Sequence, residues 1–392
     1  MNKLKTWNQN TIRNGNKSLV LKSIMTHAPI SRAEIAKKTG LNKGTVSSQV
    51  TELLKEDLIY EKGPGESSGG RRPVMLLFNR HAGYCIGIDI GVNYILGILT
   101  DLEGNVCEET STTFHQLSYE NINEKLFEIV DFLITASPQS PYEIVGIGIG
   151  VPGAVNNDGK ILLSPNLGWQ NVNLKQLINE KYNCPVIIEN EANAGAYGEK
   201  KFGVGKEGKD IVYVSVGVGI GVGLVLNGKL YRGSNGFSGE LGHMTIEVNG
   251  AKCQCGNKGC WELYASEKAL INYAHKMGYT REQDTLEKMI RLTNGGNVDM
   301  IKSFQTIGAY LGIGITNIIN TFNPEKVIIG NRLVAAKQWI KEPLLEKTQN
   351  NALWFQKDDV NVCFSELHKH ATALGVSAFT VENFLKVDIL QD

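Results

Sequence analysis

The feature that most constrains the fold of this chain is a pattern that occurs twice in its body. The segment YCIGIDIGVNYILGILTDLEGNV, which begins at residue 84, reads as an apolar strand, a turn containing glycine, a second apolar strand and the turn DLEGN. The segment IVYVSVGVGIGVGLVLNGKLYRG, which begins at residue 211, repeats that order and has NGK as its second turn. Repetition of one supersecondary unit indicates duplicated lobes. The sequence therefore predicts two similar α/β lobes that face each other across a cleft, where ligand sites are usually found.

The first eighty residues differ from this body in charge. Residues 1–80 carry 14 Lys and Arg against 6 Asp and Glu, a net charge of +8, whereas residues 81–392 carry 26 against 34, a net charge of −8. A basic module on an acidic body favours a polyanionic partner that contacts the small part only. The alternative is a solvated basic face without a partner.

Helix signals in the basic module are local and specific. Ser31 and Glu34 form a capping box that opens one helix, Gly40 closes it, and Asn42 caps the next helix. The second helix has one apolar stripe, formed by Val46, Val50, Leu53 and Leu54. A third apolar helix, SLVLKSIM, precedes both. Three short helices with a glycine-containing turn between the last two predict a helix-turn-helix motif.

The opposite face of the second helix suits the major groove of DNA. This face carries small residues that are almost uncharged and mostly able to form hydrogen bonds. They are Gly44, Thr45, Ser47, Ser48 and Thr51, with Lys43 at the N-terminal end of the helix. The segment LIYEKGPGESSGGRRPVMLLFN then reads as strand, glycine-rich turn and strand, which is a β-wing with Arg71 and Arg72 at its tip. Paired arginines on a thin ribbon suit a narrow minor groove. We expect DNA binding, although similar motifs and charged hairpins occur in proteins that bind no DNA.

Three of the seven cysteines lie in CQCGNKGC, residues 253–260. With His243 they supply one imidazole and three thiolates, Cys253, Cys255 and Cys260, which is a tetrahedral set suited to Zn²⁺. A disulfide is a poor explanation, because three cysteines leave one unpaired and Cys253 lies too near Cys255 to pair without strain. Four protein ligands leave no open position, so we expect a structural zinc ion. A redox regulator based on these cysteines remains an alternative.

Several carboxylate and amide side chains flank this cluster or recur upstream. Glu240 and Glu262 lie just before His243 and just after Cys260, SPNLGW contributes Asn166, and ENEAN contributes Asn190, Glu191 and Asn193. Such groups converging in a cleft can hydrogen-bond the hydroxyls of a sugar. Taken singly, each is more often a helix cap or a solvated carboxylate. The hypothesis of a sugar site depends on the whole set.

The motifs GELGH, CQCGNKGCWE, GVPG, SPNLGW and ENEAN resemble those of the ROK family of sugar kinases and sugar-responsive repressors. The resemblance covers residues 81 to 392 and implies two actin-like, ribonuclease H-like lobes with a structural zinc ion that positions the histidine segment. It also implies sugar contacts by six residues, namely Asn166, Asn190, Glu191, Glu240, His243 and Glu262. The winged helix-turn-helix and SSGGRRP place the chain with the repressors, and the likeness implies D-xylose as the sugar.

The departures from the family pattern all concern ATP. Family kinases have an aspartate base where this chain has Glu191, and their first phosphate loop differs at Val92, Asn93 and Tyr94. Val218 replaces the threonine of the second loop, and Gly330-Asn331 replaces a Gly-Gly pair. A carboxylate misplaced by about 1 Å can cost about a hundredfold in rate. We therefore expect a protein that is not an enzyme and binds no ATP, with an active sugar kinase bearing a DNA-binding appendage as the alternative.

These observations predict three parts in the chain. Residues 1–80 form the winged helix-turn-helix domain, residues 81–190 the first lobe together with a C-terminal helix at 372–392, and residues 191–371 the second lobe with the zinc site and a dimerisation surface. We expect a homodimeric repressor that binds a pseudo-palindromic operator and releases it when xylose binds in the cleft. The chain has no apolar run of 18 residues and its N-terminal segment is polar, so we expect a cytoplasmic protein without a membrane anchor.

Overall fold

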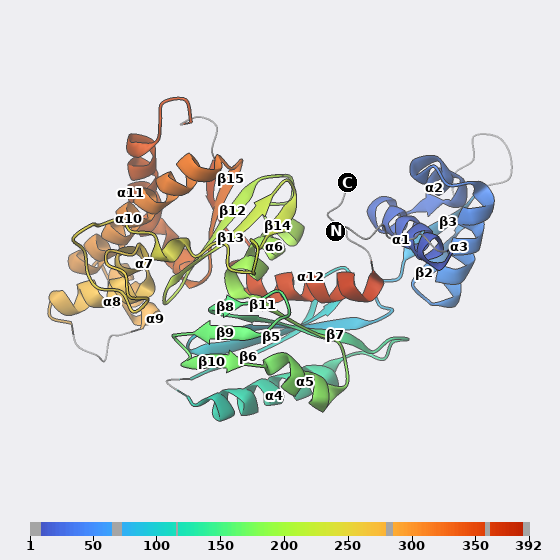
Figure 1. The fold of residues 1–392 in the computed structure, drawn as a ribbon, viewed down its shortest axis with the longest axis horizontal. Coiled ribbons are helices and arrows are strands. Elements are labelled where there is room, and N and C mark those ends of the chain that lie inside the picture. The colour runs from blue at the N-terminus through green and yellow to red at the C-terminus, as the bar shows by residue number, and fades with distance from the viewer. Residues whose placement is uncertain (1–8, 65–72, 115–116, 280–284, 357–360, 387–392) are drawn as a thin grey trace, which may run out of the picture.

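The computed structural model describes residues 9–64, 73–114, 117–279, 285–356 and 361–386. Figure 1 shows a small N-terminal domain beside two larger lobes, with the C-terminal helix α12 (Ala371–Leu385) running between all three. The protein thus has the winged-helix and two-lobed α/β architecture that the sequence predicts.

The N-terminal domain contains three helices and a small sheet. Its helices are α1 (Gln9–His27), α2 (Arg32–Thr39) and α3 (Lys43–Lys55), and its strands β1 (Ile30–Ser31), β2 (Ile59–Pro64) and β3 (Val74–Phe78) pair in the order β1-β3-β2. The capping box of Ser31 and Glu34 is present, Gly40 ends α2 with φ 71°, and Asn42 accepts a hydrogen bond of 2.8 Å from the Thr45 amide. These local predictions are confirmed.

Two features of this domain go beyond the sequence prediction. Helix α1 begins at Gln9 and is much longer than the segment SLVLKSIM, and the two-residue strand β1 was not expected. Strand β1 exists because Ile30 pairs with Leu76 of the wing, a contact between residues distant in sequence. Arg71 and Arg72, at the expected wing tip, lie outside the described residues.

The two lobes share one sheet topology, which confirms the predicted duplication. The first lobe contains β4 (Tyr84–Ile90), β5 (Tyr94–Asp101), β6 (Val106–Thr113), β7 (Ile144–Val151) and β11 (Val186–Asn190), in the order β11-β7-β4-β5-β6. The second contains β12 (Ile211–Val216), β13 (Ile220–Leu226), β14 (Lys229–Tyr231), β15 (Lys326–Gly330) and β16 (Asn361–Phe364), in the order β14-β13-β12-β15-β16. In both sheets the first strand in chain order is central and pairs antiparallel with the second and parallel with the fourth.

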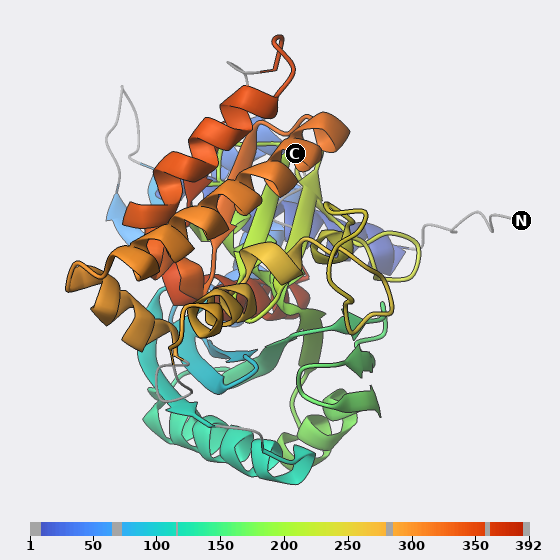
Figure 2. The same cartoon turned by 90° about the vertical axis from the view of Figure 1, so that its left-hand side faces the viewer.

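Helices cover the two faces of the first lobe's sheet. Figures 1 and 2 show α4 (Tyr119–Ala136) and α5 (Leu174–Tyr182) on the outer face, and α12 on the face toward the second lobe. A further antiparallel sheet of β8 (Ala154–Val155), β9 (Ile161–Ser164) and β10 (Trp169–Val172) extends this lobe beside the cleft. Helix α6 (Glu191–Phe202) follows β11 directly and packs on β12 and β13, so the chain crosses between the lobes there.

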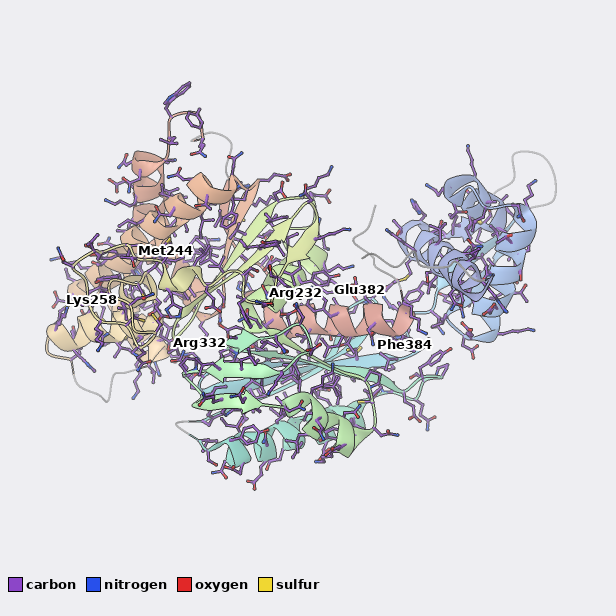
Figure 3. All side chains as sticks on the ribbon, in the orientation of Figure 1. Arg232, Met244, Lys258, Arg332, Glu382 and Phe384 are labelled. Carbon is purple, nitrogen blue, oxygen red and sulfur yellow. The ribbon has the colours of Figure 1, made fainter. Side chains whose placement is uncertain are left out.

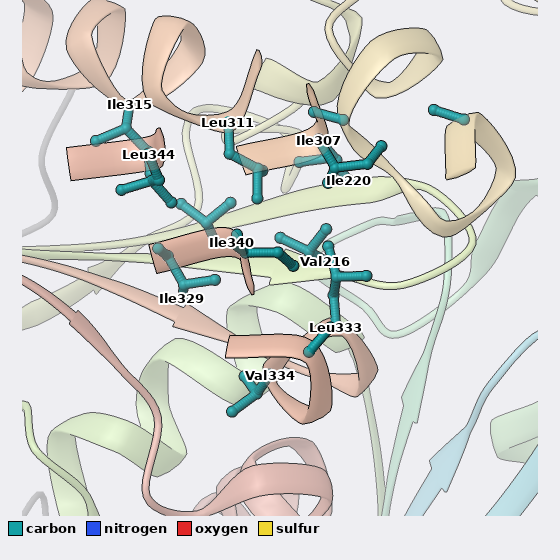
Figure 4. Packing of buried hydrophobic residues seen from close by; sticks show 14 of the residues in the cluster. Val216, Ile220, Ile307, Leu311, Ile315, Ile329, Leu333, Val334, Ile340 and Leu344 are labelled. Atoms are coloured by element: carbon teal, nitrogen blue, oxygen red, sulfur yellow. The ribbon is translucent and has the colours of Figure 1, made fainter. Parts of the chain in front are cut away.

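The second lobe is built around a large apolar core (Figure 4). Helices α10 (Val298–Phe322) and α11 (Lys337–Asn351) lie against its sheet, and α7 (Glu262–Ala265), α8 (Glu267–Lys276) and α9 (Leu286–Asn294) complete it. Ile307, Leu311 and Leu344 are fully buried there, and each such side chain contributes about 1.5–3 kcal/mol to folding. Two short 3₁₀ turns, η1 (Leu241–His243) and η3 (Arg332–Ala336), contribute residues to the interlobe cavity. A third, η4 (His368–His370), directly precedes α12.

The C-terminal helix is shorter than the sequence prediction of 372–392. It begins at Ala371 and ends at Leu385, because Lys386 adopts the left-handed conformation with φ 52° and its amide donates to the Glu382 carbonyl. The helix that begins at Ala371 therefore ends at Leu385. The rest of the predicted range, residues 387–392, lies outside the described part of the chain.

Candidate functional site

A cavity of about 480 Å³ lies between the two lobes. Residues of both sheets line it, at the glycine turn after β4, the end of β11, the turn between β12 and β13, and the segment before η1. All six predicted sugar-contact residues lie on its wall, namely Asn166, Asn190, Glu191, Glu240, His243 and Glu262. Their polar groups come from four separate segments of the chain, which only the folded lobes bring together.

Asn190 has a structural task as well as a place in the cavity wall. Its Oδ1 accepts hydrogen bonds from the Ala192 amide at 2.9 Å and the Asn193 amide at 3.0 Å, so it caps α6. Its Nδ2 donates to the Gly153 carbonyl at 2.9 Å. An amide group carries two acceptor sites and two donors. One N–H of Asn190 therefore remains for a ligand, and the other groups hold the cavity wall in shape.

Three carboxyl groups in or beside the cavity have raised pKa values. Burial raises the pKa of Glu191 to about 8, and the negative charges of Asp89 and Glu240 add to this shift. Burial raises the pKa of Asp89 to about 7, although a hydrogen bond from the Tyr94 hydroxyl opposes the change. The pKa of Glu240 is also raised by burial. Near neutral pH such groups can both accept and donate hydrogen bonds, which suits ligands rich in hydroxyls.

The four predicted metal ligands lie together beside the cavity. The ligand atoms of His243, Cys253, Cys255 and Cys260 all lie within 4.8 Å of one another. Cys253 Sγ is 3.7 Å from His243 Nδ1, and Cys255 Sγ is 3.7 Å from Cys260 Sγ. Ligands placed tetrahedrally at zinc–ligand distances lie about 3.3–3.8 Å apart. The three thiols and one imidazole therefore form a cluster that fits a metal ion.

Glycine at position 259 allows the chain to fold this tightly. Gly259 has φ 69°, and a Cβ there would lie 1.8 Å from the Glu247 carbonyl oxygen. Its own carbonyl accepts a hydrogen bond of 2.9 Å from the Ile246 amide, and the Cys253 amide donates to the Asn257 carbonyl at 2.8 Å. These bonds close two small loops, which bring Cys253 and Cys260 back to His243.

His243 belongs to both the cluster and the cavity. Its Nδ1 faces the cluster, 3.7 Å from Cys253 Sγ and 3.6 Å from Glu262 Oε1. Because an imidazole has only two nitrogens, Nε2 is the one left for a ligand in the cavity that His243 lines. Fixing Nδ1 on a metal would therefore orient the ring toward the ligand.

Elsewhere in and beside the cavity wall, polar groups are occupied by the protein's own side chains. The Tyr94 hydroxyl donates to Asp89 Oδ2 at 2.7 Å, and the Tyr94 ring covers Gly91, where a Cβ would lie 2.1 Å from a ring carbon. Arg332 lies above that ring, with its guanidinium carbon 6.0 Å from the ring centroid. Tyr94 was noted in the sequence only as a departure from a phosphate loop, and its packing could not be foreseen.

Asn331 and Arg332 belong to the second lobe and line the same cavity. Arg332 binds Glu267 through two hydrogen bonds of 3.1 and 3.2 Å and Glu287 through one of 3.0 Å. Asn331 has φ 69° and ψ −163°, a conformation normally confined to glycine, and its Nδ2 donates to Ser215 Oγ at 2.9 Å. Sequence analysis missed Arg332, and a lone arginine directly after Gly330-Asn331 was the available signal.

The predicted DNA-contact face of α3 is open to solvent. Lys43, Gly44, Ser47 and Ser48 are exposed, and Thr45 is half-buried. On the opposite face Val46, Val50 and Leu53 are fully buried, together with Gln49, which the sequence analysis did not place there. The helix therefore presents one row of small polar side chains outward.

Sequence comparisons agree with this architecture. The profile described as "ROK family" matches residues 85–383. The chain belongs to the ROK family. A second profile, described as "Winged helix-turn-helix DNA-binding", matches residues 13–60. The xylose repressor of Bacillus spizizenii is 47% identical over 380 residues, which cover 97% of this chain and 98% of that protein.

Two solved structures show both branches of the family. The crystal structure of a ROK family transcriptional regulator, a homolog of the E. coli MLC protein, has a TM-score of 0.81 and 29% identity, covering 97% of this chain and all of the other (100%). A ROK family glucokinase from Streptomyces griseus, crystallised with glucose and AMPPNP, has a TM-score of 0.69 and 26% identity. It covers 76% of this chain and 99% of its own. Among the described residues, no helix is both long enough and apolar enough to cross a bilayer.

Proposed function

We propose that this protein is a transcriptional repressor that releases its operator DNA when D-xylose binds in the interlobe cavity. The observation that carries the proposal is one chain that combines an exposed polar recognition helix with a cavity lined by carboxyl, amide and imidazole groups. The near full-length identity to a protein named xylose repressor supports xylose as the sugar. Asn166, Asn190, Glu191, Glu240, His243 and Glu262 are the contacts we assign to it.

We assign DNA recognition to the winged helix. Lys43, Gly44, Thr45, Ser47 and Ser48 on α3 enter the major groove, and Arg71 and Arg72 contact the minor groove from the wing. Two such domains in a homodimer would contact half-sites about one helical turn or a multiple of it apart, which requires a pseudo-palindromic operator. The second lobe provides the dimer surface in this proposal. Binding to chromosomal DNA assigns the protein to the cytoplasm.

The cluster of His243, Cys253, Cys255 and Cys260 holds a structural zinc ion in this proposal. Three thiolates and one imidazole are ligands that zinc prefers, and four of them leave no position for an activated water molecule. The ion would fix the segment between Glu240 and Glu262 and hold the His243 ring against the sugar. These are positioning roles, and the thiolates take no part in chemistry.

We propose that the protein transfers no phosphoryl group and binds no ATP. Asp89 already accepts a hydrogen bond from Tyr94, and Arg332 is paired with Glu267 and Glu287. In these contacts the protein's own side chains occupy polar groups that line the cavity or lie beside it. The alternative, an active sugar kinase with a DNA-binding domain, is favoured by the glucokinase of the same fold.

One titration separates the two functions. Operator DNA selected by the protein from a random library would be labelled, and its binding followed by fluorescence anisotropy during titration with xylose, glucose and related sugars. Parallel samples would contain Mg-ATP and an assay for ADP. Release by xylose without ATP is the expected result. Sugar-dependent ADP formation without any effect of sugar on DNA binding would establish the kinase instead.

A further inference from the structure

Helix α12 begins beside the segment ENEAN, residues 189–193. Thr372 Oγ1 donates a hydrogen bond of 3.2 Å to the Glu191 carbonyl, at the first residue of α6. The two helices then touch backbone to backbone. A Cβ at Gly375 would lie 1.8 Å from the Ala194 carbonyl oxygen, and a Cβ at Gly198 would lie 2.2 Å from the Ala371 carbonyl oxygen. No side chain can separate α6 from α12 at this crossing.

The opposite face of α12 fits the first lobe's sheet equally closely. A Cβ at Gly87 of β4 would lie 2.2 Å from the Ala373 carbonyl oxygen, and one at Gly148 of β7 would lie 2.4 Å from the Val376 carbonyl oxygen. Close-packed interiors transmit displacement instead of absorbing it. A movement of α6 relative to the first lobe must therefore shift α12 against at least one of these two neighbours.

Side chains tie the middle of α12 to α6 and to Arg232 of the second lobe. Tyr197 of α6 stacks on Phe379 with centroids 4.0 Å apart and donates to Glu382 Oε2 at 2.5 Å. Lys201 lies 2.6 Å from Glu382 Oε1. Arg232, directly after β14, lies over the Phe379 ring, 5.1 Å from its centroid.

Arg232 also connects α12 to the cavity wall. Its Nε donates to Glu189 Oε2 at 2.7 Å, and Glu189 Oε1 accepts from the Asn190 amide at 3.0 Å. A continuous series of contacts thus runs from Asn190 to Glu382, by way of Glu189, Arg232, Phe379 and Tyr197.

The C-terminal end of α12 lies in an apolar cluster that the winged-helix domain shares with the first lobe, since the cluster also contains Cys85, Leu102 and Val145. Val381 and Leu385 are buried in one apolar cluster with Val20 and Ile24 of α1. Phe384 packs edge-on against Tyr142 with centroids 5.0 Å apart, and Figure 3 shows it at the end of α12 nearest the DNA-binding domain.

We propose that α12 couples the sugar cavity to the winged helix. Closure of the lobes on a sugar displaces α6, α12 moves with it, and its end at Phe384 and Leu385 turns the winged helix away from its DNA-binding orientation. This inference rests on the proposed function, because it needs a sugar that binds one lobe arrangement better than the other. Since contact alone does not establish coupling, the test measures coupling directly.

The first variant is Phe384→Ala, which removes the ring that packs on Tyr142 and touches neither sugar nor DNA. We expect xylose affinity and sugar-free operator affinity to stay within about twofold of wild type, since coupling energies are separate from either affinity. The sugar-induced loss of operator affinity, typically about 5- to 150-fold in coupled systems, should fall below about threefold. Phe384→Leu, which keeps an apolar contact, should restore most of the response. The control is Phe132→Ala on α4, which alters an exposed aromatic ring of the same lobe.

The second variant, Glu382→Gln, keeps an acceptor for Tyr197 and removes the charge that pairs with Lys201. It should reduce coupling less than Phe384→Ala does. By thermodynamic reciprocity, operator DNA should lose its effect on xylose affinity by the same factor in each variant. Titration calorimetry with and without operator measures this second quantity independently.

The possible outcomes separate the two proposals. If xylose does not release the wild-type protein from its operator, the proposed function fails whatever α12 does. If wild type and Phe384→Ala are released equally, the function stands and the role of α12 is overturned. If Phe384→Ala fails to bind operator without sugar, Phe384 supports the DNA-binding fold and the coupling role is likewise overturned.

Discussion

Two sets of residues in and beside the wall of the interlobe cavity differ in how their polar groups are used. Glu191, Glu240 and His243 line the cavity and keep groups available for a ligand. Tyr94 instead donates to Asp89, and Arg332 is held by two glutamates. Part of one cavity wall can therefore offer polar groups to a ligand while other side chains of the protein satisfy the rest.

The largest effect is expected from a change in the metal cluster beside the proposed sugar site. Cys255→Ser removes one of the three thiolates and should lower metal affinity by more than about 100-fold, since even changes around the ligands cost 10- to 100-fold. Without the ion, His243 and Glu262 lose their common anchor, so xylose binding should fall below detection. Metal analysis and titration calorimetry measure the two effects. Cys107→Ser, at an exposed cysteine of β6, is the matched control. Full xylose affinity in a metal-free protein would refute this role of the cluster.

A smaller loss is expected from Glu240→Ala. Removing the carboxyl that we assign to the sugar hydroxyls should weaken xylose binding by about 10- to 100-fold, because charged hydrogen bonds contribute about 1.5–3 kcal/mol. Operator affinity without sugar should not change. Glu207→Ala, at an exposed glutamate, serves as the control. Unchanged xylose affinity would remove Glu240 from the sugar site.

The contact between Tyr94 and Asp89 is tested by stability. Tyr94→Phe removes the hydrogen bond from the Tyr94 hydroxyl to the buried Asp89 carboxyl and should lower the free energy of unfolding by about 1–3 kcal/mol. Urea denaturation measures it, with Tyr60→Phe at an exposed tyrosine as the control. Xylose affinity should stay close to that of wild type. A large loss of xylose affinity would show that the two sets of residues are not independent.

The smallest effect concerns pH. The Glu191 carboxyl has a folded-state pKa of about 8 against an ordinary value of 4.5, so it holds a proton that the unfolded chain releases between these values. Folding stability should therefore fall as pH rises through this window, by about 1 kcal/mol from Glu191 between pH 6 and 7. Glu191→Gln should remove this slope. Equal slopes in wild type and variant would contradict the assigned burial.

Local signals in the sequence were sufficient for much of the fold. The capping residues Ser31 and Asn42 and the glycine at position 40 act within one helical turn, so a short window of sequence reveals them. The duplicated strand pattern predicts both sheets because each lobe repeats the same alternation of strands and turns. The set of His243 and three cysteines is confined to 18 residues, from 243 to 260, and its chemistry is specific.

Long-range contacts were beyond sequence reasoning. Strand β1 forms only because Ile30 meets the wing, and the Tyr94 ring covers Gly91 only in the folded lobe. The amide of Asn190 looked like a ligand group, yet most of its hydrogen bonds hold α6 and Gly153. Arg332 acquires its place from Glu267 and Glu287, which lie more than forty residues away in sequence.

The apolar cluster shared by α1 and the end of α12 has a consequence for protein engineering. A chimeric regulator made by joining residues 1–80 to a different sensor would leave Val20 and Ile24 facing a foreign surface, without Val381 and Leu385. The transferred winged-helix domain would lose both folding stability and its response to the sensor. A transplant that works should carry the last two turns of α12 along with the winged helix, so the exchangeable unit is assembled from both ends of the gene.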